Sequence, residues 1–153
     1  MPNLNDLVAD AFIALFQDST ALGYSLSIPD DNIRRFAQAK FKDDELNLVQ
    51  LPGIAVKVTR GRMVHSRVAC YQFTVDCLLN MQADDTSDTT WDTVSGNFES
   101  ILTIDDLVGG LNDRAGGILV RGIVERIPGA PEIVERHWRQ TGRVVLWASL
   151  NRV

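Results

Sequence analysis

Asp84, Asp85 and Asp88 form the carboxylate cluster that most resembles a metal-binding loop in this sequence of 153 residues. Calcium loops need a glycine for the sharp turn and a glutamate that closes the site. A calcium loop starting at Asp84 would have Thr89 at the glycine position and Ser95 at the glutamate position. We therefore interpret the three aspartates as solvated side chains at the start of a helix, where carboxylates are favourable.

Nucleophilic catalysis would need Cys70, Cys77 or a serine supported by His65 or His137. The chain contains no nucleophile elbow, no glycine-rich phosphate loop and no local Cys/His signature. The cysteines lie seven residues apart in a predicted strand, so they fall on opposite faces, more than about 20 Å apart, and cannot form a disulfide. With two histidines, no zinc ligand set has a recognisable spacing. We predict that the protein is not an enzyme and holds no cofactor and no metal.

Hydrophobic spacing predicts the elements that would position these residues. In the N-terminal part, apolar residues at helical spacing over 4–16 predict an amphipathic helix, and alternation over 24–28 predicts a short strand. Residues 30–50 have a weaker pattern. We expect them to form an inserted loop that begins with a short helix capped by Asp30 or Asp31.

In the middle of the chain, alternation predicts half-buried strands over 54–59 and 69–79, with residues 60–67 as a polar turn between them. The apolar residues of 91–102 follow at helical spacing, and 104–111 predicts a short further helix. We expect the 91–102 helix to pack on the sheet face that carries Tyr71, Phe73 and Val75.

The C-terminal region predicts two long antiparallel strands, 118–127 and 133–150, joined by the turn Pro128-Gly129-Ala130-Pro131. Gly142 is expected to mark a bulge in the second strand. Helices that interrupt hairpins favour an α+β fold. We therefore predict one domain over residues 1–153, with an N-terminal helix and a mainly antiparallel sheet of about four strands that has helices packed on one face.

Charge is unevenly distributed along the chain. Residues 61–120 carry 3 basic and 9 acidic side chains, a net charge of −6, whereas residues 121–153 carry 6 and 3, a net charge of +3. Either the two regions neutralise each other within one subunit, or the acidic middle of one subunit contacts the basic strands of another. The overall charge of −5 argues against a protein that reads nucleic-acid sequence.

The segment Glu135-Arg136-His137-Trp138-Arg139 has the most unusual local composition. Arginine and tryptophan are enriched among interface anchors, and Arg136 and Trp138 would share one face of a strand. The candidate interface residues are Asp84, Asp85, Asp88, Arg121, Arg136, Trp138 and Arg139. The alternative is that Trp138 closes the core while the arginines stay solvated.

The longest apolar run, Ala11–Phe16, has six residues, too few for a membrane span of about twenty. The N-terminus also lacks the basic and apolar regions of a secretory signal. We expect a protein made in the cytosol that does not cross a membrane.

The order of these motifs resembles the tail-terminator and related head-tail neck proteins of tailed bacteriophages. The similar features are a strand that opens with Leu-Pro-Gly-Ile-Ala-Val, a longer strand leading into Met-Gln-Ala-Asp-Asp-Thr, the 91–102 helix, and a terminal strand in which Glu-Arg-His-Trp-Arg runs into Val-Val-Leu-Trp-Ala. The resemblance covers residues 51–150, and the N-terminal helix is in the corresponding place. Residues 30–50 are longer than the usual connection.

The resemblance implies a non-enzymatic structural protein that forms a ring, commonly a homo-hexamer, which terminates the tail tube and joins it to the head connector. Its partners would be the tail tube protein and a connector or neck protein. It would be made in the host cytoplasm and reside in the neck or tail of the virion. Compact subunits of this length, six in contact, leave a lumen of roughly 40 Å, which lets DNA pass without sequence readout.

Two other roles remain open at this point. A head-tail connector adaptor or tail-completion protein of the neck would use the same fold with different partners. A cytosolic oligomeric binding module would instead show a concave pocket with convergent polar groups and would form no ring.

Overall fold

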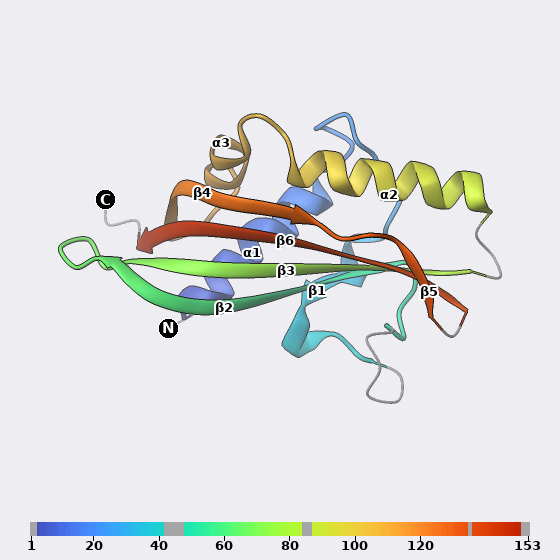
Figure 1. The fold of residues 1–153 in the computed structure, drawn as a ribbon, viewed down its shortest axis with the longest axis horizontal. Coiled ribbons are helices and arrows are strands. Elements are labelled where there is room, and N and C mark those ends of the chain that lie inside the picture. The colour runs from blue at the N-terminus through green and yellow to red at the C-terminus, as the bar shows by residue number, and fades with distance from the viewer. Residues whose placement is uncertain (1–2, 42–47, 84–86, 135, 151–153) are drawn as a thin grey trace.

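A mixed six-stranded sheet is the central layer of this computed structural model, which describes residues 3–41, 48–83, 87–134 and 136–150. The helices are α1 (Leu4–Gln17), α2 (Asp88–Leu102) and α3 (Leu107–Asn112). The strands are β1 (Ile33–Arg35), β2 (Gly53–His65), β3 (Cys70–Gln82), β4 (Ile118–Pro128), β5 (Glu132–Val134) and β6 (His137–Leu150). Two 3₁₀ turns, Asp30–Asn32 and Phe36–Gln38, flank β1 (Figure 1).

The strand order is β1-β2-β3-β6-β4, with β5 beside β6. The four long strands alternate in direction, whereas β1 runs parallel to β2. The α+β class and the N-terminal helix are therefore confirmed, but the sheet has six strands rather than about four, and it is mixed because β1 is parallel to β2 while every other pairing is antiparallel. β1 was not predicted, and β5 was predicted only as the start of the strand 133–150; each has three residues, too few to produce a recognisable alternation of its own.

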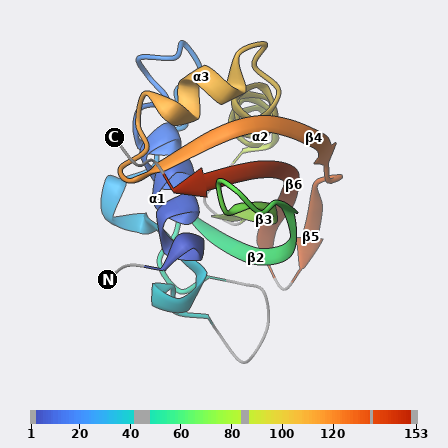
Figure 2. The same ribbon diagram turned by 90° about the vertical axis from the view of Figure 1, so that its left-hand side faces the viewer.

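All three helices contribute to one large apolar core on one face of the sheet. Asn3 caps α1 by accepting a hydrogen bond from the backbone of Asp6, and Ser87 caps α2 in the same way through Thr90. The core combines the apolar stripes of the helices with the inward faces of β2, β3, β6 and β4. Figure 2 shows α1 across the sheet, with α2 and α3 beside β4.

Part of the opposite sheet face is covered by the segment that the sequence predicted as an inserted loop. Leu48, Ala55 and Leu78 form a second small core there, against which Phe36 and Phe41 pack with their ring centroids 4.8 Å apart. The described part of 30–50 is therefore structured, and its side chains Phe36, Ala39, Phe41 and Leu48 lie on the face that the helices leave open.

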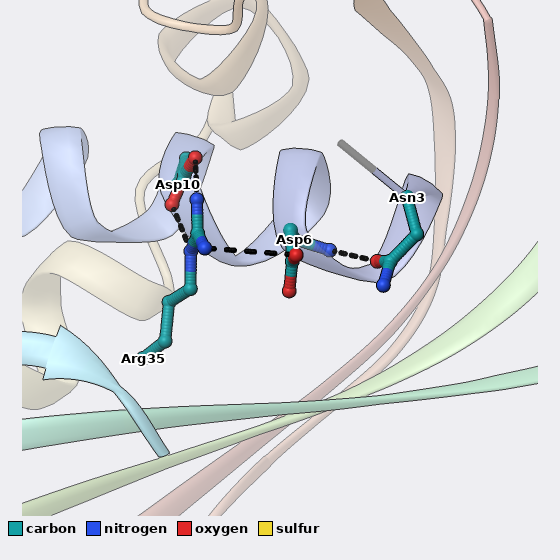
Figure 3. Close-up of polar contacts among 4 residues, drawn as sticks. All are labelled: Asn3, Asp6, Asp10 and Arg35. Carbon is teal, nitrogen blue, oxygen red and sulfur yellow. Dashed lines mark hydrogen bonds and ion pairs between the residues drawn. The ribbon is translucent and has the colours of Figure 1, made fainter. Parts of the chain in front are cut away.

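A bidentate ion pair attaches this segment to α1 (Figure 3). Arg35 donates from Nε and Nη2 to the two carboxylate oxygens of Asp10 at 2.8 and 2.7 Å, and its Nη1 lies 3.6 Å from Asp6. The hydrogen bonds to Asp10 raise the pKa of Arg35. Because two parallel hydrogen bonds join the guanidinium to the carboxylate, the ion pair fixes the orientation of β1 relative to α1 as well as holding the two together.

Three expectations about where strands and turns lie are wrong. Residues 24–28 form no strand. The expected polar turn over 60–67 is mostly strand, because β2 continues to His65. The expected strand over 133–150 is broken by Arg136, whose φ of 67° belongs to a turn, so β5 and β6 are separate strands.

Gly142 marks no bulge, because the pairing of β3 with β6 is regular through it. Its missing side chain instead makes room for Leu102 of α2, whose Cδ1 occupies the place where a Cβ would lie. The β4–β6 pairing has the irregularities, between Val120 and Gly122 and between Ile123 and Glu125.

Candidate assembly surfaces

The distal part of the β2–β3 hairpin, residues 59–70, forms an arm at one end of the molecule (Figure 1). Every side chain from Thr59 to Val68 is exposed, because none of the three helices covers this part of the sheet. Its exposed apolar side chains include Met63, Val64 and Val68. An exposed strand with such side chains is typical of a surface that another chain covers.

The arm is also basic. Arg60 lies over the ring of Tyr71, 5.0 Å from its centroid, and among the described residues no carboxylate lies within ion-pair distance of Arg62 or Arg67. In the sequence, residues 46–75 contain four Lys or Arg and no acid, whereas residues 76–113 contain nine Asp or Glu and no base. A count over residues 61–120 begins inside the arm, so it adds the bases of the arm to the acids that follow and does not show that the two are separated along the chain.

A surface hollow of about 450 Å³ lies where the turn of the arm meets β4 and β6. Arg67 and Arg121 both line it, together with the apolar side chains of Val68, Leu119 and Leu150. Arg121 is exposed, and its Nε donates to Ser149 at 2.8 Å. The predicted interface residue Arg121 therefore belongs to the basic end of the molecule.

The other predicted basic residues lie at the opposite end of β6. Trp138 stacks on Trp91 of α2, with ring centroids 5.2 Å apart and planes 11° apart, and therefore closes one end of the core. Its buried Nε1 has no hydrogen-bond partner among the described residues. Arg139 pairs with Glu132 at 2.6 Å.

Arg136 precedes β6 in a turn, so it shares no strand face with Trp138, contrary to expectation. Ser149, the partner of Arg121, lies eleven positions after Trp138 along β6, which corresponds to about 36 Å. Asp88 lies exposed in the first turn of α2, and Asp84 and Asp85 lie outside the described residues. The predicted interface residues therefore do not form one patch.

Within the subunit, acids already neutralise part of the basic C-terminal region. Arg143 of β6 donates from Nε to Asp76 of β3 at 2.8 Å, and this carboxylate raises the pKa of Arg143. Arg126 of β4 donates to the backbone oxygen of Ile104 at 2.8 Å. The Arg143 and Arg139 ion pairs favour neutralisation within one subunit for the C-terminal strands, whereas the arm has no such partners among the described residues.

Both outer edges of the sheet are partly unpaired. On β2, β1 pairs only as far as Val56, and Asn5 of α1 reaches the backbone oxygen of Val58 at 3.5 Å. On β4, the side chain of Asn112 donates to the backbone oxygen of Val120 at 2.9 Å and accepts from its N–H at 2.7 Å. Beyond these two asparagine contacts, no described strand pairs with the outer side of residues 59–65 or 121–128.

The cysteine and histidine candidates do not assemble a reactive centre in the part of the chain that the structure describes. Burial raises the pKa of Cys77, so its thiol stays protonated. His65 is the register partner of Cys70 across the hairpin, but the histidine is exposed, the thiol is buried, and no side-chain hydrogen bond joins them. No group of three or more His, Cys, Asp or Glu side chains within the described residues could hold a metal ion.

The sequence matches no known protein-family profile, and it matches no curated protein. Solved structures do match: one, whose name states no function, shares 15% of its residues with this chain at a TM-score of 0.51. The match covers 97% of this chain and 96% of that one. At this identity the similarity shows a common fold alone. No helix within the described ranges is long and apolar enough to cross a membrane.

Proposed function

We propose that this protein is a non-enzymatic structural subunit that assembles into a ring in the neck or tail of a phage virion, where it terminates the tail tube and joins it to the head connector. One observation carries the proposal: within the described residues, part of the outer edge on each side of the sheet has no strand partner. Its four long strands alternate in direction, so β4 of one copy and β2 of the next would continue the same antiparallel order. Such head-to-tail contacts close into rings when the rotation between copies permits it.

The ring proposal is tested by the size and shape of the full-length protein in sedimentation velocity and negative-stain images. Replacing Val124 by lysine should shift the protein toward smaller species, because Val124 is 48% exposed on β4 and an edge lysine opposes strand pairing. Val49→Lys is the matched control, since Val49 is 56% exposed and lies in no strand.

A wild-type chain that sediments as a monomer at all concentrations would contradict the ring. Equal weakening of assembly by both lysine variants would contradict the role of the edge.

The role as terminator, in preference to adaptor or tail-completion protein, rests on the sequence resemblance described above. It is tested by adding the assembled protein to a polymerising tail tube protein. Tubes should stop growing and carry one additional ring at the end. If tubes lengthen unchanged while the ring binds a connector protein, the adaptor role is the correct one.

A further inference from the structure

We propose that the basic arm of one copy docks along the outer edge of β4 in a second copy, where it meets the acidic side chains around α3. This inference rests on the proposed ring and identifies the side chains that would specify its contact. Four observations lead to it: an arm without cover, a free edge of suitable length, complementary charges, and the position of those charges.

The arm has the properties of a segment that another chain completes. Its outer edge from Thr59 to His65 lacks a strand partner among the described residues, and its side chains are exposed on both faces. Cations alternate with Met63, Val64 and Val68, all at least 37% exposed. Apolar side chains of this kind gain from burial against protein, whereas a phosphate backbone offers them nothing to pack on.

On the receiving side, β4 offers the edge 121–128. Two irregularities in its pairing with β6 interrupt the ladder, one on each side of Ile123. Bulges on an edge strand limit indiscriminate pairing with other strands. Because the bulges also interrupt the backbone ladder, hydrogen bonds along this edge would contribute less, and side-chain charges would supply much of the specificity.

The required acids lie next to this edge. Ile104 accepts a hydrogen bond from Arg126, and Asn112 pairs with Val120, so the segment between them runs beside β4. This segment and the residue that follows it carry Asp105, Asp106 and Asp113, all exposed. Among the described residues, none of the three has an ion-pair partner.

The positions of arm and acids favour a contact between copies. In Figure 1, β4 with α2 and α3 forms one side of the molecule, and β2 forms the other. A neighbouring copy that adds its β2 to β4 in the antiparallel order would place its arm beside α3. The cations of each arm would then meet carboxylates that its own subunit does not neutralise.

The test combines charge reversal with compensation. Arg62→Glu/Arg67→Glu should weaken assembly about tenfold or more at low salt, with a smaller effect at high salt because screening reduces the repulsion. Asp105→Lys/Asp113→Lys should weaken it similarly. The protein with all four changes should recover most of the assembly. Asp106 is left intact because it caps α3 through the Gly109 N–H.

Two matched controls accompany these variants. Lys40→Glu reverses one exposed charge that lies in no strand, and Asp88→Lys/Asp92→Lys reverses two acids on α2. Neither should weaken assembly comparably, and the α2 variant should not rescue the reversed arm. Thermal melts of every variant confirm folding, which these exposed positions should not affect.

The outcomes separate this inference from the proposed function. If the wild type forms rings and the arm variant forms them equally well at low salt, the docking of the arm is wrong and the ring stands. If the wild type forms no ring, both fail. If rings are unchanged but the arm variant loses binding to random duplex DNA at physiological salt, the arm is a DNA contact and the docking proposal is overturned.

Discussion

Arginine side chains in this protein differ according to whether a carboxylate of the same chain lies beside them. Arg35, Arg114, Arg139 and Arg143 each pair with an aspartate or glutamate from another segment. These pairs fix the segment containing β1, the end of α1 and the surface of β6, although exposed pairs contribute only about 0 to 1 kcal/mol each. Arg62 and Arg67 of the arm have no such acid within the described residues, so their charge is available to a partner.

Gly142 is the residue whose replacement gives the sharpest test of the helix packing. A Cβ at this position would overlap Cδ1 of Leu102, which is 4% exposed. Gly142→Ala should therefore lower the free energy of unfolding by about 1 to 3 kcal/mol, as measured by denaturant unfolding.

The double variant Gly142→Ala/Leu102→Ala provides the control. Leu102→Ala alone leaves a cavity and should cost about 2 to 5 kcal/mol. The alanine methyl at position 142 would occupy part of that cavity. The double variant should therefore lose less free energy of unfolding than the two single variants lose in sum. Additive effects would show that α2 does not pack against β6 at this point.

At the scale of elements, α2 joins the sheet through both apolar and polar contacts. Its Phe98 stacks on Phe16 of α1 with ring centroids 5.5 Å apart. Gln140 of β6 accepts from Ser95 at 2.5 Å and donates to Glu99 at 2.7 Å, so one buried side chain connects two turns of the helix to the sheet. The helix packs on the predicted face of the sheet, the one that carries Tyr71, Phe73 and Val75. On that face its direct contacts include Gly142 and Gln140 of β6.

Phe98→Ala should lower the free energy of unfolding by about 3 to 5 kcal/mol, because Phe98 is fully buried between α1 and the sheet. Asp92→Ala is the matched control on the same helix, where an exposed side chain should leave the melting temperature nearly unchanged. Thermal melts of both variants decide the matter. A Phe98→Ala protein as stable as wild type would mean that α2 does not pack its Phe98 side chain into the core.

At the scale of the whole molecule, the two ends of the sheet carry different side chains. The arm and its hollow, with Arg67 and Arg121, form one basic end, and α2 begins with exposed Asp88 at the other (Figure 1). In a ring built through the sheet edges, every copy would present its arm toward the same rim. The proposed ring would therefore have two unlike rims, as a joint between two different partners requires.

Trypsin reports directly on whether assembly covers the arm. Arg67 lies exposed in the turn after β2, so an isolated subunit should be cut there early. The wild-type ring should resist cleavage at Arg67 compared with the Val124→Lys variant, which keeps the arm but weakens the edge. Mass spectrometry of early fragments identifies the site.

Cleavage after exposed Lys40 serves as the internal control and should proceed at similar rates in both proteins. If Arg67 is cut equally fast in ring and variant, the arm stays uncovered in the assembly.

The sequence by itself determined the elements whose periodicity is long. The apolar stripe of α1, the alternation in β3 and the spacing from Trp91 to Leu102 each extend over at least ten residues, so each predicts its element without a neighbour. Local composition also identified Trp138 as unusual, and the alternative in which it closes the core agrees with its stacking on Trp91.

Tertiary structure alone decided the rest, because it depends on partners that are distant in the sequence. β1 and β5 form only against β2 and β6, and Gly142 is explained by Leu102, forty residues earlier. The same holds for charge. Sequence shows how many arginines the C-terminal strands carry. Only the fold shows that Arg139 and Arg143 meet acids while Arg62 and Arg67 meet none among the described residues, since an ion pair depends on distance in space.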